Sequence, residues 1–307
     1  MTLRPSSVVE LAAMARDAHD GRTPLRIAGR GSWLGAGGSV RPDAVRLDVS
    51  GLAGILEYVA GDLTLTARAG TTLEELDAAT ATHGQWCPLL PWGGDDVTLG
   101  AVFSTATTGP FSRSLGRPRD LALGLEFVDG TGAIVRGGGR VVKNVAGFDL
   151  TRLLVGSWGT LGVITEVSMR LRARPKSDET WALAIDPGDV TACDRLSAFE
   201  RGPYAPLASQ RLDAAVCDRL GLAARDTVLV RLGGNASFVA ASRDAIRAIG
   251  QAQPCDASMW TRCRAIDTPE SAVAVQNALA DPVSRRVKKQ FDPRHVLNPE
   301  ILGEGSA

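Results

Sequence analysis

The sequence predicts an α+β fold of two units, and three observations support this prediction. Helix patterns alternate with short strand patterns along the first 175 residues. Glycine supplies 34 of the 307 residues, above the usual share of about 7%, and much of it lies in three clusters before residue 163. Arg174-Pro175 then looks like a boundary, after which a smaller set of strands and helices follows. We therefore expect a large unit with binding loops built from backbone, and a smaller second unit.

The first unit is expected to alternate helices and strands. Ser7-x-x-Glu10 is a capping box that opens a helix to about residue 18, ended by Gly21 and Pro24. Thr72-x-x-Glu75 opens a second helix, which runs to residue 83 and stops at Gly84. A loop-rich region is expected from residue 93 to residue 109. Strand patterns cover residues 25–28, 45–49 and 63–69, and a hairpin pattern covers residues 123–128 and 133–135.

The segment from Gly147 to Glu166 is the most informative part of the chain. It reads as a short helix, a turn punctuated by Gly156, Gly159 and Gly162, and then an alternating strand. Apolar and polar residues alternate from Val163 onward. Such dense glycine after a helix lets the backbone turn tightly and approach another group closely.

The second unit is predicted to be a small α+β domain. Strand patterns cover residues 181–185 and 227–232. Helix patterns lie near residues 190–201, 237–252 and 269–280.

Composition excludes several classes of function. Lys+Arg and Asp+Glu both number 34, so no charge excess calls for nucleic acid or an anionic membrane. The five cysteines are scattered without a CxxC pair, which indicates a reducing compartment and argues against zinc or iron–sulfur ligation. The N-terminus lacks a signal pattern and no apolar run could span a bilayer. We expect a cytoplasmic protein, and any association with a membrane would be made through partners.

The first glycine loop is suited to an anion. Gly29, Gly31 and Gly35 have the wrong spacing for a Rossmann fingerprint, and no helix pattern follows them. The sequence also contains no P-loop motif. A run of exposed amides after a strand could cradle a pyrophosphate, with Arg30 adding positive charge. From the loop alone, a glycine-rich surface turn is an equal alternative.

Several further motifs occur in a recognisable order. They are Ile27-Ala-Gly-Arg-Gly-Ser-Trp-Leu-Gly35, Thr66-Ala-Arg-Ala-Gly70, Thr98-Leu-Gly-Ala101 through Gly109, the turn and strand to Glu166, and Phe291-Asp-Pro-x-x-Val-Leu-Asn-Pro299. Together they resemble the flavin-binding domain of the vanillyl-alcohol oxidase/p-cresol methylhydroxylase (PCMH) family. The resemblance implies a PCMH-type FAD-binding domain of two subdomains at residues 1–175. It implies a substrate- or cap-like domain of reduced size at 176–290, and a tail at 291–307 that returns to the flavin domain.

The resemblance also implies which residues bind FAD. Some family members bond FAD covalently through a histidine at the position of Ser32, so we expect non-covalent binding here. Ala101 replaces the second glycine of the family's T-I-G-G motif. The expected cofactor-binding residues are Ala28, Gly29, Arg30, Gly31, Ser32, Trp33, Gly70, Pro91, Thr98, Leu99, Gly100, Ala101, Thr105, Thr108, Gly109, Gly159, Gly162, Val163 and Ile164.

Within the family, the motifs are most similar to those of FAD-binding (E) subunits of glycolate oxidase. This likeness implies an accessory flavin subunit that takes part in 2-hydroxy-acid oxidation and electron transfer, beside a second flavoprotein and an iron–sulfur subunit. The alternatives are a free-standing FAD-dependent 2-hydroxy-acid dehydrogenase and a non-catalytic scaffold with a flavin fold. No metal is expected, because His19, His83 and His295 are isolated in the sequence.

The sequence identifies no catalytic residue. Arg113, Arg117 and Arg119 could hold a carboxylate, or they form an ordinary solvated loop. Lys143-Asn144 could face the cofactor or simply turn the chain. Trp86 and Trp92 could pack beside the flavin ring, although core packing is the better interpretation.

Overall fold

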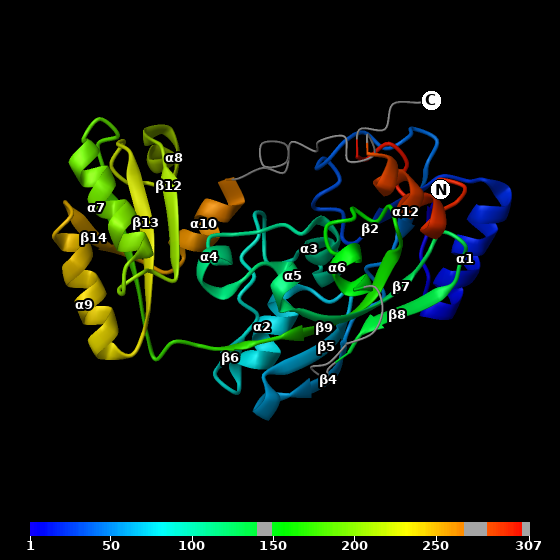
Figure 1. Ribbon diagram of the computed structural model, residues 1–307, viewed down its shortest axis with the longest axis horizontal. Helices are drawn as coiled ribbons and strands as arrows, with labels where there is room; N and C mark the ends of the chain where they lie inside the picture. The colour runs from blue at the N-terminus through cyan, green and yellow to red at the C-terminus, as the bar shows by residue number, and fades with distance from the viewer. Residues whose placement is uncertain (140–148, 267–280, 303–307) are drawn as a thin grey trace.

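The computed structural model describes residues 1–139, 149–266 and 281–302 of the chain. The molecule is elongated, and two parts lie side by side along its length (Figure 1). The larger part contains the N-terminal elements and the C-terminal helix. The smaller part surrounds a separate sheet of residues 177–255.

A small parallel sheet with the strand order β1-β3-β2 begins the chain. Its strands are β1 (Thr2–Leu3), β2 (Leu25–Ala28) and β3 (Val45–Asp48), and α1 (Val8–Gly21) packs against it. Ser7 accepts a hydrogen bond from the Glu10 amide at 3.1 Å, which confirms the predicted start of the helix. Only this half of the predicted capping box forms, because the Glu10 carboxylate accepts hydrogen bonds from Ser6. The left-handed residue at the helix end is Arg22.

A five-stranded antiparallel sheet forms the centre of the larger part, in the order β4-β5-β9-β7-β8. One face carries the main core, in which Leu65, Val167 and Phe127 are fully buried against α2 and α3. On the other face, Thr66 and Ser168 share a hydrogen bond of 2.8 Å. The elements are β4 (Ile55–Val59), β5 (Thr64–Arg68), β7 (Ala122–Val128), β8 (Ile134–Gly138), β9 (Val163–Arg170), α2 (Leu73–Ala81) and α3 (Leu99–Thr105).

The smaller part is a four-stranded antiparallel sheet with helices on both faces. Two helices, α7 and α9, pack on one face around Leu196 and Val239. On the other face, α8 and α10 share a core with Trp86 and Phe111 of the larger part, so this core joins the two parts. The elements are β12 (Ala208–Leu212), β13 (Thr227–Gly234), β11 (Ser177–Ala184), β14 (Ala252–Cys255), α7 (Val190–Arg201), α8 (Ala214–Arg219), α9 (Ala236–Arg247) and α10 (Met259–Ile266).

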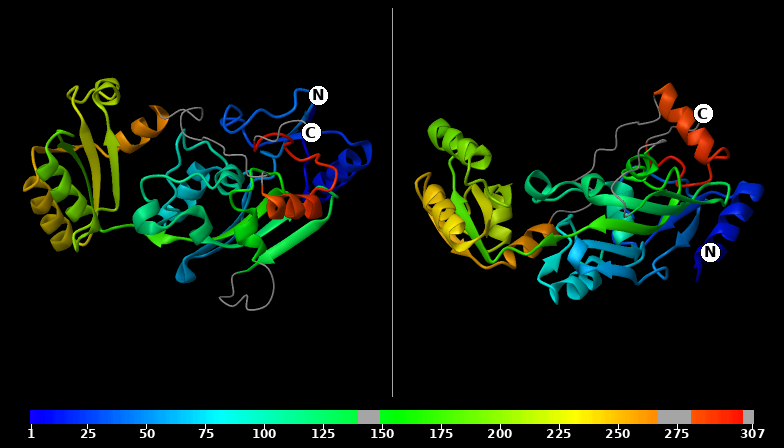
Figure 2. Two further views of the ribbon diagram at one scale, coloured as in Figure 1. Left: turned by 45° about the horizontal axis from the view of Figure 1, so that its top comes forward. Right: turned by 60° about the horizontal axis from the view of Figure 1, so that its bottom comes forward.

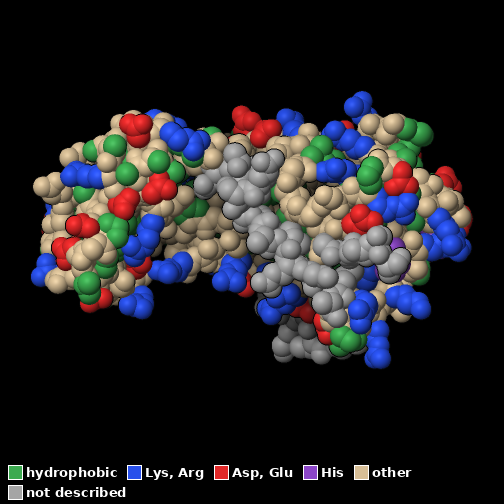
Figure 3. Space-filling model, turned by 90° about the horizontal axis from the view of Figure 1, so that it is seen from above, with side chains coloured by type: hydrophobic (Ala, Val, Ile, Leu, Met, Phe, Trp, Pro, Cys, Tyr) green, Lys and Arg blue, Asp and Glu red, His purple; other side chains and the backbone are tan. Residues whose placement is uncertain are grey.

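Shorter elements lie between the strands of the larger part or lead into the smaller part, and two of them pair as a two-stranded antiparallel sheet. They are η1 (Ala60–Asp62), β6 (Gln85–Trp86), α4 (Ser112–Leu115), α5 (Pro118–Leu121), α6 (Leu150–Leu154) and β10 (Arg172–Ala173). Among the described residues, no helix is long and apolar enough to cross a lipid bilayer. Positive and negative side chains are interspersed over both parts of the face in Figure 3, in keeping with the formal net charge of zero.

The C-terminal segment crosses back to the larger part. In both views of Figure 2, α12 (Pro282–Phe291) lies with the N-terminal elements, away from the smaller sheet. The ammonium group of Lys288 is fully buried and donates hydrogen bonds to the carbonyls of Thr160 and Leu297 and to the carboxylate of Asp292. The chain then runs beside β2, where Leu25 and Leu297 form a bridge. One buried ion pair therefore joins the last helix, the tail and the loop before β9.

The structure differs from the sequence prediction at several elements. The region expected as a loop from residue 93 contains helix α3, because Thr98 caps it and Val102 and Phe103 turn into the core. The helix expected over residues 237–252 ends at Arg247, and β14 follows. The strand β4 was not predicted. The helix expected at residues 269–280 lies outside the described residues.

The buried Lys288–Asp292 pair generates a prediction about stability. We expect Asp292→Asn to lower the free energy of unfolding by about 3–5 kcal/mol, since it leaves a buried ammonium group without a counter-charge. Urea unfolding followed by circular dichroism measures this change. The control is Asp43→Asn, which breaks the exposed Arg41–Asp43 pair and should change the free energy by less than about 1 kcal/mol. Equal effects of the two substitutions would contradict the role given to the buried pair.

Candidate functional site

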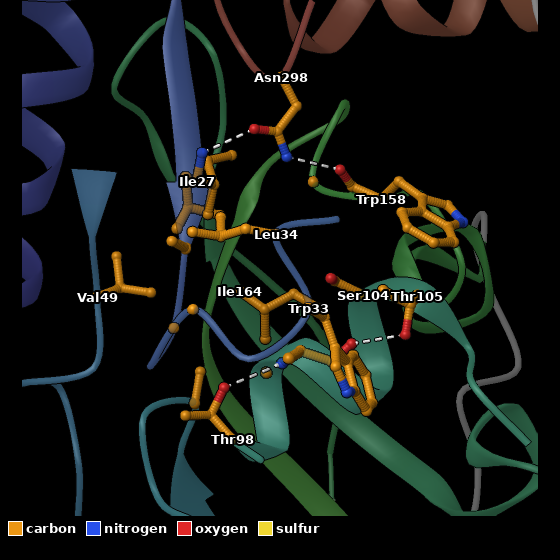
Figure 4. A pocket seen from close by; sticks show the side chains of 18 of the residues that line it. Ile27, Trp33, Leu34, Val49, Thr98, Ser104, Thr105, Trp158, Ile164 and Asn298 are labelled. Atoms are coloured by element: carbon orange, nitrogen blue, oxygen red, sulfur yellow. Dashed lines mark hydrogen bonds between the residues drawn. The ribbon is translucent and has the colours of Figure 1, made fainter. Parts of the chain in front are cut away.

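A pocket lies in the larger part of the molecule, where four segments meet (Figure 4). Its walls are the end of β2 with the loop after it, the N-terminal half of α3, the loop and strand around residues 158–164, and the tail at Asn298 and Ile301. It encloses about 860 Å³, part of which is open to solvent. The cavity itself, without that open space, is about 100 Å³, which is smaller than the roughly 300–1,000 Å³ usual for small-molecule and cofactor sites.

Most of the residues expected to bind a cofactor line this one pocket. They come from three sequence motifs that are far apart along the chain. The residues are Ala28, Gly29, Arg30, Gly31, Ser32, Trp33, Thr98, Gly100, Ala101, Thr105, Gly159, Gly162, Val163 and Ile164.

The loop after β2 presents free backbone donors. Within the described chain, none of the amides of residues 29–33 donates a hydrogen bond. Gly31 has a φ of +90°, a left-handed value that favours glycine and that occurs in anion-binding backbone nests. Arg26 and Arg30 line the same pocket, and a Cβ on Gly31 would lie 3.0 Å from the Arg46 guanidinium. No Asp or Glu lines it among the described residues. The donor set therefore suits an anion such as a pyrophosphate.

The glycines of the pocket are required mainly by contacts between its own walls. A Cβ on Gly29 would lie 2.4 Å from the hydroxyl oxygen of Thr98, and one on Gly159 would lie 2.8 Å from the Asn298 amide nitrogen. Neither distance is tolerable for two non-bonded heavy atoms. These glycines let β2, α3 and the tail approach one another, and the pocket is the space left between them.

The hydroxyl groups on α3 have internal partners. The Thr98 hydroxyl caps the helix and accepts a weak hydrogen bond from the Ala101 amide at 3.4 Å. The Thr105 hydroxyl donates to the Ala101 carbonyl at 2.8 Å. These side chains therefore help to shape the wall that α3 contributes to the pocket, and the Thr105 hydroxyl already donates within the helix.

Asn298 is the main pocket residue that sequence analysis did not identify. Its side-chain oxygen accepts a hydrogen bond from the Ile27 amide at 2.7 Å, and its side-chain nitrogen donates to the Trp158 carbonyl at 2.8 Å (Figure 4). The only signal was its place in the C-terminal motif. Other lining residues that were missed are Arg26, Ile27, Leu34, Ala36, Val49, Ala69, Ser104, Trp158 and Ile301.

Five expected cofactor residues lie outside the pocket. Leu99 is fully buried in the core. Gly70 packs on the backbone carbonyls of residues 49, 50 and 52, where a Cβ would lie less than 3 Å from each. The carbonyl of Pro91 accepts a hydrogen bond from Arg264. Thr108 and Gly109 line a second cavity between the two parts of the molecule.

The other polar candidates are scattered. Arg113 pairs with Glu200 at 3.3 Å, and Arg119 donates to the Arg152 carbonyl at 2.8 Å. Arg117 caps α5. None of the three lines the pocket. Lys143 and Asn144 lie outside the described residues.

The two tryptophans have different neighbours. Trp86 packs on Phe111 in the core that joins the two parts. Trp92 stacks on Trp33, with ring centroids 4.0 Å apart. Trp92 therefore contacts a residue of the pocket wall.

Within the described chain, no three His, Cys, Asp or Glu side chains are grouped so that they could hold a metal ion. His83 contacts Thr82 and Tyr58, and His295 is exposed. Burial raises the pKa of the Cys87 thiol to about 12, so the thiolate that binds metals is not formed at neutral pH.

Comparison with known sequences shows which proteins the chain resembles. Residues 1–138 match the family described as FAD binding domain. The chain is 40% identical over 168 residues to glycolate oxidase subunit GlcE of Escherichia coli (strain K12), covering 54% of this chain and 47% of that protein. It is 33% identical over 185 residues to a D-lactate dehydrogenase of Archaeoglobus fulgidus, covering 60% and 41%. The chain spans about half the length of these relatives.

Comparison with solved structures identifies the fold. p-Cresol methylhydroxylase superposes with a TM-score of 0.67 at 13% identity, covering 94% of this chain and 63% of that one. Alkyldihydroxyacetonephosphate synthase superposes with a TM-score of 0.67 at 22% identity, covering 87% and 55%. These likenesses show that the chain has an α+β fold similar to that of p-cresol methylhydroxylase, and residues 1–138 of this fold match the FAD binding domain family.

Proposed function

We propose that FAD binds non-covalently in this pocket, with its pyrophosphate on the amides of residues 29–33. The five free amides are the observation that carries the proposal, because buried or clustered donors without an acceptor favour an anion strongly. Val163 and Ile164 would contact the adenine end, and Thr98, Gly100 and Ala101 the flavin end. Ser32 has no nucleophilic ring nitrogen, so a covalent bond through the histidine position of some relatives is not available.

We further propose that the chain takes part in the oxidation of a small 2-hydroxy acid as an accessory subunit of a glycolate oxidase-like complex. When FAD is bound, it supplies the redox chemistry: it can accept a hydride and pass on the two electrons. The names of the glycolate oxidase subunit and the D-lactate dehydrogenase support this substrate class. Another relative, from Bacillus subtilis (strain 168), is named glycolate oxidase subunit GlcD.

The chemistry of the pocket favours an accessory role. Among the described residues that line it, none is His, Asp, Glu, Lys or Cys. Oxidation of a hydroxy acid removes the hydroxyl proton, and a positioned base usually accepts it. The pocket supplies donors and apolar contacts but no such base. We therefore expect the chain to need a second flavoprotein and an iron–sulfur protein for efficient turnover.

Two other functions remain alternatives to this proposal. A free-standing FAD-dependent 2-hydroxy-acid dehydrogenase would turn over without partners. A non-catalytic scaffold would keep the fold but bind no flavin. The free amides after β2 favour flavin binding over the scaffold.

The pyrophosphate loop generates a prediction about affinity. Gly31→Asp should weaken FAD binding more than about tenfold, a loss of roughly 1.4 kcal/mol or more, since a carboxylate enters the proposed nest and the residue is strained at positive φ. Titration calorimetry on the apoprotein measures the affinity. Flavin released by acid precipitation of the wild type should be FAD.

Two variants separate the causes of this loss. Gly31→Asn carries the strain without the charge and should weaken binding less. Gly84→Asp places the same residue at a left-handed position far from the pocket and should leave the affinity unchanged. An unchanged affinity for Gly31→Asp would place the pyrophosphate elsewhere, and flavin retained in the acid precipitate would contradict non-covalent binding.

The accessory role generates a prediction about partners. The isolated chain should oxidise glycolate or D-lactate slowly or not at all with an artificial electron acceptor. Adding the second flavoprotein and the iron–sulfur protein should produce activity, and the complex assembled with Gly31→Asp should be less active than that with Gly84→Asp. Rapid 2-hydroxy-acid oxidation by the chain alone, unaffected by partners, would instead establish the free-standing dehydrogenase.

A further inference from the structure

A buried arginine reaches from the smaller part of the molecule into a loop of the larger part. Arg264, on α10, is only 3% exposed. Its Nε donates a hydrogen bond to the Pro91 carbonyl, and one terminal nitrogen donates to the Gly94 carbonyl at 3.3 Å. The other terminal nitrogen pairs with the Asp95 carboxylate at 2.5 Å. The Gly93 amide donates in turn to the Arg264 carbonyl at 2.9 Å.

These contacts hold the loop on both sides of Trp92. Pro91 precedes this tryptophan, and Gly93 to Asp95 follow it. Trp92 is 8% exposed, and its indole packs against that of Trp33 in a tilted arrangement, with ring centroids 4.0 Å apart and a 43° angle between the planes. Trp33 is the last residue of the loop with free amides and lines the pocket. A continuous chain of contacts therefore runs from Arg264 through Trp92 to that loop.

The other end of α10 is anchored in the smaller part. The Trp260 indole donates a hydrogen bond to the Thr180 hydroxyl of β11 at 3.0 Å. Met259, Trp260 and Cys263 are buried in the core that joins the two parts. The position of Arg264 is thus set by the smaller sheet, and its guanidinium transmits that position to the loop at residues 91–95.

Three of the five N–H donors of this guanidinium are used within the protein. Each of its three nitrogens already donates to the 91–95 loop. Arginine presents its donors in a rigid planar fork, which matches several fixed acceptors at once. These contacts suit an arginine that orders a loop rather than one that captures a carboxylate.

We infer that Arg264 is a positioning residue that couples the smaller part of the molecule to the cofactor pocket by holding Trp92 against Trp33. The inference rests on the proposed function in one respect, that FAD uses the loop ending at Trp33. Without the arginine, Trp92 loses its fixed place, Trp33 loses its stacking partner, and the amide loop becomes less ordered. Ordering this loop on binding then costs more, and FAD affinity falls.

The test combines a spectroscopic readout on the apoprotein with FAD affinity. Two indoles packed this closely give a coupled near-ultraviolet circular dichroism signal. The difference between the spectra of the wild type and Trp92→Phe identifies the signal of the Trp33–Trp92 pair. We expect Arg264→Met to lose most of that signal and to weaken FAD binding between about twofold and tenfold, the range set by one aromatic pair. Arg264→Met combined with Trp92→Phe should bind FAD no more weakly than Trp92→Phe alone, since both act through one contact.

Two further variants serve as controls for this test. Arg262→Met removes an arginine from the same helix, whose guanidinium donates to the Leu220 carbonyl, and should change neither readout. Arg264→Lys keeps the charge but not the fork, and it should lose part of the signal. If far-ultraviolet spectra show that Arg264→Met does not fold, Arg264→Lys replaces it in both the circular dichroism and the FAD-affinity measurements.

Two results would overturn the inference. One is a native Trp33–Trp92 signal in the Arg264 variants. The other is a double variant whose loss of affinity is the sum of the two single losses. If the wild type binds no FAD, the proposed function fails, but the signal in the apoprotein still reports whether Arg264 positions Trp92.

Discussion

The side chain of Asn298 closes the pocket on which the rest of the account depends. One amide group accepts from the Ile27 backbone and donates to the Trp158 carbonyl, so it joins strand β2 to the loop before β9. The Lys288–Asp292 pair holds the tail that carries Asn298, because the buried ammonium also binds the Thr160 carbonyl. Buried charged and polar groups are stable only when every partner is present. The C-terminal tail is therefore part of the pocket wall.

The pocket is assembled from segments that cannot form it alone. The strand β2 supplies the amide loop, α3 and β9 supply apolar walls, and the tail supplies the clamp. Arg264 adds a fifth connection from the smaller part, through Trp92 and Trp33. A change in the smaller sheet or in the tail should therefore reach the amide loop without any contact with the ligand.

Local signals predicted the elements that depend on local interactions. The cap at Thr72 and the alternating strand from Val163 were both predicted, since their partners are near in sequence or their burial has a period of two. Asn298 could not be predicted, because its partners are 271 and 140 residues away. Gly109 was expected to bind the cofactor, and in the structure a Cβ added at this position would clash with the Leu90 carbonyl oxygen. A glycine indicates that something approaches closely, and the sequence does not say whether that is a ligand or the chain itself.

The central claim is that the amides of residues 29–33 are free in the protein and are occupied by FAD. Amide hydrogen exchange, measured by mass spectrometry on a peptide that covers this loop, tests the claim most directly. We expect these amides to exchange rapidly in the apoprotein and at least about tenfold more slowly with FAD bound, as amides gain protection when they acquire acceptors. Protection already present without FAD, or exchange that FAD does not change, would contradict the account.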